Sequence, residues 1–290
     1  MSTSAIPRVT VITPAYNASA TIVESVMSAL TQTVSDLEVI VVDDGSSHPI
    51  ADSLADIRDR RLRIIRTETN RGVSAARNTG LGAARSPVIA QLDADDFWRP
   101  DHLEGLLPAL DDPAIGLAYS NAEIIGSKLV HRAIVAGKPG DDRPKRMNDR
   151  SMHPVNDLSK LYRVNPIPAP AVIMRTAAIR AVGGYPNWLT VGEEYYVYIK
   201  LRRAGWLFAY VDRLSVVYRW PEPGRGVSYD GRRSARQILK LFTVLALRSS
   251  PDPAIFKRLG YELINLVVTH VPATVTVARR IRASAQRPAK

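Results

Sequence analysis

Three aspartates lie within four residues, in the segment Asp93-Ala94-Asp95-Asp96. Carboxylates this close repel one another, and each raises the pKa of its neighbours unless a cation compensates their charge. Their oxygens suit hard divalent ions such as Mg²⁺ or Mn²⁺, which commonly share their coordination sphere with substrate phosphates. The cluster therefore indicates either a divalent-metal site or a solvated acidic turn, and its place in the fold has to decide between the two.

The segment before this cluster is almost wholly apolar, as is typical of a short buried strand over residues 88–92. Strands are also predicted at 8–13, 38–42 and 62–66, and helices at 18–30 and 73–84. Alternating strands and helices with short connections predict an α/β fold with a mostly parallel central sheet flanked by helices, in the manner of Rossmann-like domains.

Polar turns follow each of these four strands, and ligands collect beyond the carboxyl ends of parallel strands. We therefore expect four turns to form one binding site: Pro14-Ala15-Tyr16-Asn17, Asp43-Asp44-Gly45-Ser46-Ser47, Asn70-Arg71-Gly72 and Asp93-Ala94-Asp95-Asp96.

Further along, helices are predicted at 101–110, 176–182 and 192–205, and strands at 115–120, 123–125, 171–174, 206–211 and 216–218. Glu193 and Glu194 lie in the first turn of the helix over 192–205, where the helix dipole favours negative charge. The pair is thus either ordinary N-terminal helix acidity or part of a functional site.

The positive charge is concentrated at the end of the chain, since residues 225–290 carry a net charge of +10 out of +11 for the whole sequence. Three helices are predicted there, at 234–247, 253–269 and 274–284. Their apolar faces either pack in a core or lie on an anionic membrane surface. Nucleic-acid binding is not expected, because the positive charge is confined to the end of the chain and no aromatic–basic interleaving occurs. The absence of cysteine excludes disulfides and thiolate chemistry.

Several motifs together resemble glycosyltransferase family 2. They are Val-Ile-Thr-Pro-Ala-Tyr-Asn (11–17), Val-Asp-Asp-Gly-Ser (42–46), Asn-Arg-Gly-Val-Ser-Ala-Ala-Arg-Asn (70–78), Leu-Asp-Ala-Asp-Asp (92–96), Gly-Gly-Tyr (183–185) and Gly-Glu-Glu-Tyr (192–195). The resemblance covers residues 8–220. It implies a GT-A fold over 1–224, with a nucleotide-sugar-binding half at 1–97 and an acceptor-binding half at 98–224. A basic helical C-terminal extension follows at 225–290.

The resemblance also implies inverting transfer of a sugar from a nucleotide-diphospho-sugar to a hydroxyl acceptor, assisted by Mg²⁺ or Mn²⁺. Asp95 would be the stronger metal ligand, with Asp93 beside it, and Asp44 would accept a hydrogen bond from the nucleobase. Glu194 matches the general base, although the family commonly has Asp there, which leaves Glu193 as an alternative. The residues that would bind the nucleotide sugar are Thr13, Pro14, Ala15, Tyr16, Asn17, Asp43, Asp44, Arg71, Asp93 and Ala94.

One further departure concerns the diphosphate. Many members carry a His shortly after a Tyr-Arg pair, whereas here Tyr218 and Arg219 are followed by Trp220. Arg219 or Arg225 could supply positive charge instead, or either could be an ordinary surface residue.

The expected partners are a UDP-sugar donor and a glycan or lipid-linked acceptor. Residues 232–290 would contact an anionic membrane at its periphery or pack on the catalytic domain, and the expected location is the cytoplasm or the inner face of the cell membrane. The alternative is a non-catalytic nucleotide-sugar-binding or scaffold protein docked through its basic tail.

Overall fold

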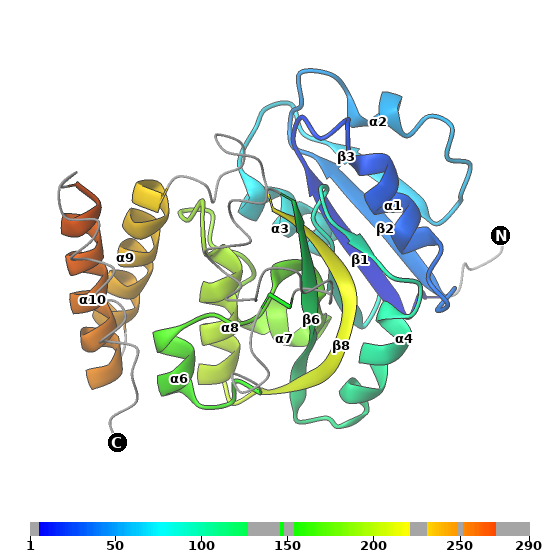
Figure 1. Ribbon diagram of the computed structural model, residues 1–290. Coiled ribbons are helices and arrows are strands. Elements are labelled where there is room, and N and C mark those ends of the chain that lie inside the picture. The colour runs from blue at the N-terminus through cyan, green and yellow to red at the C-terminus, as the bar shows by residue number, and fades with distance from the viewer. Residues whose placement is uncertain (1–5, 127–145, 148–153, 221–230, 249–251, 271–290) are drawn as a thin grey trace, which may run out of the picture. The chain divides into compact units, whose positions relative to one another are not determined.

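The computed structural model describes residues 6–126, 146–147, 154–220, 231–248 and 252–270 (Figure 1). The chain divides into two compact units, Met1–Glu222 and Pro223–Lys290. The first unit contains an eight-stranded sheet with the order β3-β2-β1-β4-β7-β6-β8-β5 among the described residues.

The first four strands are parallel and form the nucleotide-binding type of sheet that the sequence predicts. Each is short and followed by a crossover helix or turn, and all but β3, which carries Arg63 and Arg66, are mostly apolar and buried. Their bounds are β1 Val9–Ala15, β2 Leu37–Asp43, β3 Leu62–Arg66 and β4 Val88–Gln91.

The second half of the sheet is mixed. Strand β7 (Val172–Arg175) is antiparallel to both β4 and β6 (Ile115–Gly126), whereas β8 (Leu207–Trp220) is parallel to β6. The short strand β5 (Phe97–Trp98) lies antiparallel to β8. One sheet therefore runs through both of the halves that the sequence separates at residue 97.

Strands β6 and β8 are each one long strand, where the sequence predicts two. Their pairing shifts register on either side of Asn121, and the Asn121 side chain accepts a hydrogen bond from the backbone N–H of Ala122 at 2.9 Å. The break in hydrophobic pattern is a bulge within a continuous strand. Figure 1 shows the two strands curving side by side.

The helices cover both faces of the sheet. Helix α1 (Ile22–Leu30) and helix α4 (His102–Leu106) pack on one face, and α3 (Val73–Ala83) packs on the other. Helix α1 begins four residues later than expected, after a turn. The helix expected at 101–110 ends at Leu106 and continues as a 3₁₀ segment, Leu107–Asp111, because Pro108 has no N–H to donate.

Of the remaining elements of the first unit, α2 lies beside α1 and the others lie around the second half of the sheet. Helices α7 (Thr176–Ala181) and α8 (Glu193–Arg203) match the predicted segments closely. Helix α2 (Ile50–Ser53), helix α6 (Leu158–Arg163) and the 3₁₀ turn Ala169–Ala171 were not predicted, and all three are six residues or shorter.

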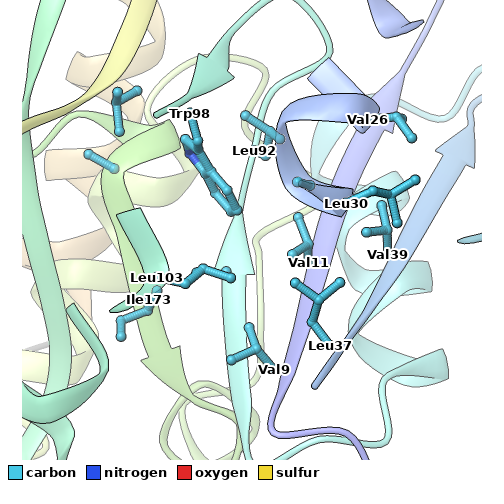
Figure 2. Packing of buried hydrophobic residues seen from close by; sticks show 14 of the residues in the cluster. Val9, Val11, Val26, Leu30, Leu37, Val39, Leu92, Trp98, Leu103 and Ile173 are labelled. Atoms are coloured by element: carbon cyan, nitrogen blue, oxygen red, sulfur yellow. The ribbon is translucent and has the colours of Figure 1, made fainter. Parts of the chain in front are cut away.

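The core between the sheet and α1 is a cluster of aliphatic side chains. Figure 2 shows Val9, Val11, Leu37 and Val39 of the strands facing Val26 and Leu30 of α1, and Leu92, Trp98, Leu103 and Ile173 extend the cluster. The Nε1–H of Trp98 donates to the carbonyl of Pro170 at 2.7 Å, so this large buried ring has no orphaned donor.

On the opposite face, α3 approaches β1 closely at Gly80. A Cβ added to Gly80 would lie 2.5 Å from Cγ2 of Ile12, so only glycine fits there without displacement. This contact sets how closely α3, and the side chains it carries, pack against β1.

The second unit contains α9 (Gly231–Leu247) and α10 (Pro253–His270), which match two of the predicted helices. They pack together through Leu241, Phe242, Leu245 and Ile255, and Arg258 lies over the Phe242 ring at 5.5 Å. The helix predicted at 274–284 lies outside the described residues. None of the described helices combines the length and the apolar character that crossing a bilayer requires.

Candidate functional site

The four predicted turns do meet at the carboxyl edge of the parallel strands. Residues at the ends of β1, β2 and β3 are register partners, with Ala15 opposite Asp43 and Asp43 opposite Arg66. The chain after β4 joins the same edge, where the N–H of Leu92 donates to the carbonyl of Ile12 at 3.2 Å.

The turn after β1 is held against the turn after β2 by Asn17. Its backbone has φ 52°, a left-handed conformation that Asn tolerates better than most residues. Its Oδ1 accepts hydrogen bonds from the N–H and the hydroxyl of Ser47, both at 2.9 Å, and its N–H donates to Oγ of Ser46 at 2.9 Å. The neighbouring Tyr16 ring stays 53% exposed, and an exposed ring at this edge can stack on a planar base.

Asp43 is fully enclosed by its own turn. Its carboxylate accepts hydrogen bonds from the N–H groups of Ser46 and Ile50 and from Nη1 of Arg66. Burial by itself would raise the pKa of Asp43, but the hydrogen bonds from Ser46 and Ile50 and the charge of Arg66 outweigh it, so the pKa lies below its ordinary value. The structure therefore gives Asp43 a role in shaping the turn, and its predicted contact with a nucleotide stays a prediction.

Asp44 anchors the turn before α3. Its carboxylate accepts the N–H of Arg71 at 3.0 and 3.1 Å and the N–H of Gly72 at 2.7 Å, and Thr67 donates a further bond at 3.2 Å. The Arg71 side chain is exposed. Thr13 and Ala15 are buried, Pro14 is half-buried, and the Thr13 hydroxyl has no hydrogen-bond partner among the described residues. The nucleotide contacts expected of these five residues stay predictions.

The acidic cluster after β4 contains three different environments. Asp93 is half-buried and paired with an arginine, whereas Asp95 reaches solvent and takes part in no ion pair within the described residues. Protein atoms crowded around its carboxyl group, followed by the charge of Asp93, raise the pKa of Asp95 to about 6. Asp96 is buried and accepts the N–H of Arg219 at 2.8 Å. Burial, then the charges of Asp95 and Asp93, raise the pKa of Asp96 well above its ordinary value. Ala94 is buried between them.

Arg219 contacts this acidic cluster both through its backbone N–H and through its guanidinium. Its Nη1 donates to the carbonyl of Asp95 at 2.8 Å, it forms an ion pair with Glu24, and its guanidinium lies 4.8 Å from the centre of the Phe97 ring. From the sequence, Arg219 or Arg225 could supply positive charge to the diphosphate or be an ordinary surface residue. Arg219 lies at this edge beside Asp95, and its role toward a diphosphate stays a prediction. Arg225 lies outside the described residues.

Arg77 of α3 is a further functional candidate, which the sequence did not predict. Its side chain is 4% exposed, with Nη2 2.7 Å from Oδ1 of Asp93 and Nη1 2.5 Å from Oε1 of Glu193. A signal was available, because Arg77 shares a buried helix face with Ser74 and Leu81. A charge on such a face requires buried partners of opposite sign.

Glu193 and Glu194 begin α8 after Gly192, which adopts a left-handed φ of 77°. Glu193 is buried against Arg77, whereas Glu194 is half-buried. Burial, followed by the charge of Glu193, raises the pKa of Glu194 to about 8, and the charge of Arg77 opposes the shift. A carboxyl group whose pKa lies near the operating pH is suited to accept and release a proton.

The residues at this edge fit a divalent ion that shares its ligands with a substrate. No group of three or more His, Cys, Asp or Glu side chains in the described ranges is arranged to hold a metal without help. Mg²⁺ is usually held by one or two carboxylates plus substrate phosphates, and Asp93 and Asp95 provide such a pair. The raised pKa of Asp95 reflects crowding and a neighbouring negative charge, and a bound cation would relieve the repulsion.

A family model described as Glycosyl transferase family 2 matches residues 10–167. The succinoglycan biosynthesis protein ExoO of Rhizobium meliloti is 42% identical over 120 residues, which are 41% of this chain and 34% of that protein. The Escherichia coli UDP-Glc:alpha-D-GlcNAc-diphosphoundecaprenol beta-1,3-glucosyltransferase WfgD is 36% identical over 128 residues, or 44% of this chain and 51% of that protein. The chain thus spans about a third to a half of the length of these relatives.

Two solved structures share the fold. Staphylococcus aureus TarS 1-349 in complex with UDP-GlcNAc superposes with a TM-score of 0.66 at 18% identity, over 89% of this chain and 72% of that one. The mannosyltransferase PcManGT of Pyrobaculum calidifontis, in complex with GDP-Man and Mn²⁺, gives a TM-score of 0.62 at 19% identity, over 97% of this chain and 80% of that one.

Proposed function

Because the chain belongs to glycosyltransferase family 2 and has a GT-A fold, we propose that it is an inverting, metal-dependent enzyme that moves a sugar from a nucleotide-diphospho-sugar to a hydroxyl group. One observation in this chain supports the proposed mechanism beyond membership of the family. A single buried guanidinium joins Asp93, next to the exposed carboxyl group of Asp95, to Glu193, next to the half-buried Glu194. The groups needed for a diphosphate leaving group and for an attacking hydroxyl are thus built into one cluster.

The donor that this edge suits best is a UDP-sugar. The exposed Tyr16 ring offers a stacking surface, and the exposed side chain of Arg71 offers N–H donors at the same edge. WfgD is named for UDP-Glc and the TarS structure is a complex with UDP-GlcNAc, which supports uridine as the base.

Asp93 and Asp95 would hold Mg²⁺ or Mn²⁺ together with the donor's diphosphate. When bound, the ion would act as a Lewis acid that stabilises the negative charge developing on the departing nucleoside diphosphate. Arg219 lies at the same edge and adds positive charge beside Asp95.

Glu194 is the proposed general base. It would accept the proton of the acceptor hydroxyl on the side of the sugar opposite the leaving group, which gives inversion in one displacement. Help of this kind is worth about 10²–10⁴-fold in rate. Glu193 is less suited to the role because its carboxylate is already paired with Arg77.

The test is a thermal-shift titration of the whole chain with UDP, UDP-glucose and UDP-GlcNAc, each with and without Mn²⁺. A ligand that binds only the folded state raises the melting temperature, so we expect a rise that requires Mn²⁺ and disappears in Asp95→Asn. Equal shifts with and without the ion would argue against a metal-assisted site. Turnover of any donor would exclude the alternative of a non-catalytic nucleotide-sugar-binding scaffold.

The acceptor side of the proposal is a glycan or a lipid-linked saccharide at the cytoplasmic face of a membrane. Phe256, Leu263 and Ile264 are each more than half exposed and share one face of α10, in a segment with net positive charge. Such a face suits an anionic bilayer surface. Sedimentation with phosphatidylglycerol-containing vesicles, compared with phosphatidylcholine vesicles, should be lost in the variant Leu263→Glu/Ile264→Glu. Equal sedimentation of the wild type and the variant would contradict membrane binding through this face.

A further inference from the structure

Arg77 bridges parts of the chain that are far apart in sequence. It lies on α3, Asp93 lies in the turn after β4, and Glu193 begins α8, 116 residues away from Arg77. The exposed fractions of the three side chains are 4%, 24% and 7%, so the cluster is mostly removed from water.

Burial makes this guanidinium consequential. A buried ion pair contributes little net stability, but removal of one partner leaves an uncompensated charge that the protein tolerates poorly. Here one removal would orphan two carboxylates at once. The flat guanidinium can direct separate N–H groups at two acceptors, whereas the point charge of a lysine on a flexible stem cannot hold both in the same geometry.

The surroundings hold the guanidinium in place. The ring of Tyr185 lies 5.6 Å from Cζ of Arg77, and the Asn78 side chain bonds both the N–H and the carbonyl of Tyr185, at 2.9 and 2.7 Å. The backbone carbonyl of Asp93 is separately fixed by the hydroxyl of Ser25 at 3.0 Å. In this orientation Nη2 of Arg77 binds Oδ1 of Asp93, Nε of Arg77 has no hydrogen-bond partner among the described residues, and Oδ2 of Asp93 accepts no hydrogen bond from any described residue.

We propose that Arg77 is a positioning residue that fixes Asp93 relative to Glu193, so that Glu193 is the counter-ion of Arg77 and Glu194 is left to act on the acceptor. This assignment rests on the proposed function, because Asp93 and Glu194 are the groups being positioned. It predicts that the metal-side and acceptor-side carboxylates lose their arrangement together when Arg77 is replaced.

The first experiment measures melting temperatures at pH 8 without nucleotide. Arg77→Met should lower the melting temperature by about 10 °C, because two carboxylates lose their buried partner. The double variant Arg77→Met/Glu193→Gln should melt higher than Arg77→Met, since one orphaned charge has been removed. If Arg77 only fills space, the double variant will melt no higher than the single one, and the assignment is wrong.

The second experiment measures binding of UDP with Mn²⁺ by calorimetry. Arg77→Met and the double variant should both bind at least about tenfold more weakly than the wild type, a 1.4 kcal/mol effect, and Arg77→Lys should lie between them and the wild type. Arg63→Met is the control for removing an arginine away from this edge, because Arg63 is 41% exposed and pairs with Glu38 near the amino ends of β2 and β3, where Glu38 keeps Arg85 as a second partner. It should bind UDP normally.

Wild-type affinity for UDP with Mn²⁺ in the folded Arg77→Met variant would overturn the positioning role. A wild-type protein that binds no nucleoside diphosphate would instead contradict the proposed function, and the melting-temperature comparison would still decide the role of Arg77.

Discussion

Nη1 of Arg77 lies 2.5 Å from Oε1 of Glu193, whereas the next residue, Glu194, takes part in no ion pair within the described residues. Two consecutive glutamates in the first turn of one helix therefore have different chemical environments. One is neutralised by a buried cation, and the other has its pKa raised to about 8 by burial and by its neighbour.

Glu194→Gln should therefore cost more activity than Glu193→Gln. The amide cannot accept a proton from the acceptor, so kcat should fall by about 10²–10⁴-fold while donor binding is retained. Glu193→Gln should lower kcat less, by a fold-change at least about tenfold smaller than that of Glu194→Gln, because it changes a counter-ion and not the proposed base. Steady-state kinetics of both variants provide the measurement, and the opposite ranking would assign the base to Glu193.

The pH dependence of the rate provides an independent check on the same carboxyl group. A base works only when deprotonated, so kcat/KM should rise with pH, reach half of its maximum near pH 8 and level off above about pH 9, since its profile reports the free enzyme. Glu193→Gln should move this rising limb to lower pH, because it removes a charge that raises the pKa of Glu194. A limb that stays in place would show that Glu194 does not control the profile.

Asp95 and Asp96 should respond differently to the same substitution. Asp95→Asn removes an accessible carboxylate, and binding of Mn²⁺ with UDP should weaken by about 100-fold or more, as expected for loss of a metal ligand. Asp96→Asn preserves an acceptor for the N–H of Arg219 at a buried position whose pKa is already raised. It should change binding by less than about threefold, and calorimetric titration of the two variants would distinguish them.

The parallel half of the sheet and its binding edge could be predicted from sequence because their signals are local. Residues 88–92 are apolar except for Gln91, and the polar turn comes directly afterwards. The mixed half could not, because the antiparallel pairing of β7 with β4 joins Val88 to Arg175, and no short-range pattern records that contact. The bulge at Asn121 interrupts the hydrophobic pattern, so the sequence predicts two strands where β6 is one.

The candidate site divides along the same line. Asp93, Asp95, Glu193 and Glu194 are visible as carboxylates at element ends, whereas the role of Arg77 depends on partners 16 and 116 residues away. Asp43 and Asp44 were expected to face a ligand, and both have most of their hydrogen bonds with backbone groups of neighbouring turns. Sequence identifies which residue types reach the edge, but the pairing among them is a property of the folded chain.

The spacing of α3 from the sheet can be tested with two glycines of the same helix. Gly80→Ala would place a Cβ 2.5 Å from Ile12, so we expect a loss of about 1–3 kcal/mol in the free energy of unfolding. Gly82→Ala meets no atom within 4 Å and should be neutral or gain up to about 1 kcal/mol from helix propensity. Urea denaturation measures both changes. Because α3 carries Arg77, Gly80→Ala should also weaken binding of UDP with Mn²⁺, and equal stability of the two variants would contradict the close contact.

His102 should make the stability of the first unit sensitive to acid. Its ring is fully buried against Trp98, with Nδ1 2.9 Å from Oγ of Ser215 and Nε2 without a partner among the described residues. Burial, followed by the charge of Arg213, lowers the pKa of His102 to about 3. In the unfolded chain the pKa returns to about 6.5, so the unfolded state binds the proton first as pH falls.

The contribution of His102 is therefore fully present above pH 6.5 and is lost progressively between about pH 6.5 and pH 3. Between pH 7.5 and pH 5 this amounts to about 2 kcal/mol of unfolding free energy. His102→Phe keeps a ring beside Trp98 but cannot titrate, so the difference in stability between wild type and variant should shrink by that amount over the same interval. The carboxyl groups that titrate in this range are common to both proteins and cancel in the difference. Parallel stability curves from urea denaturation would mean that the pKa of His102 in the folded protein equals its value in the unfolded chain.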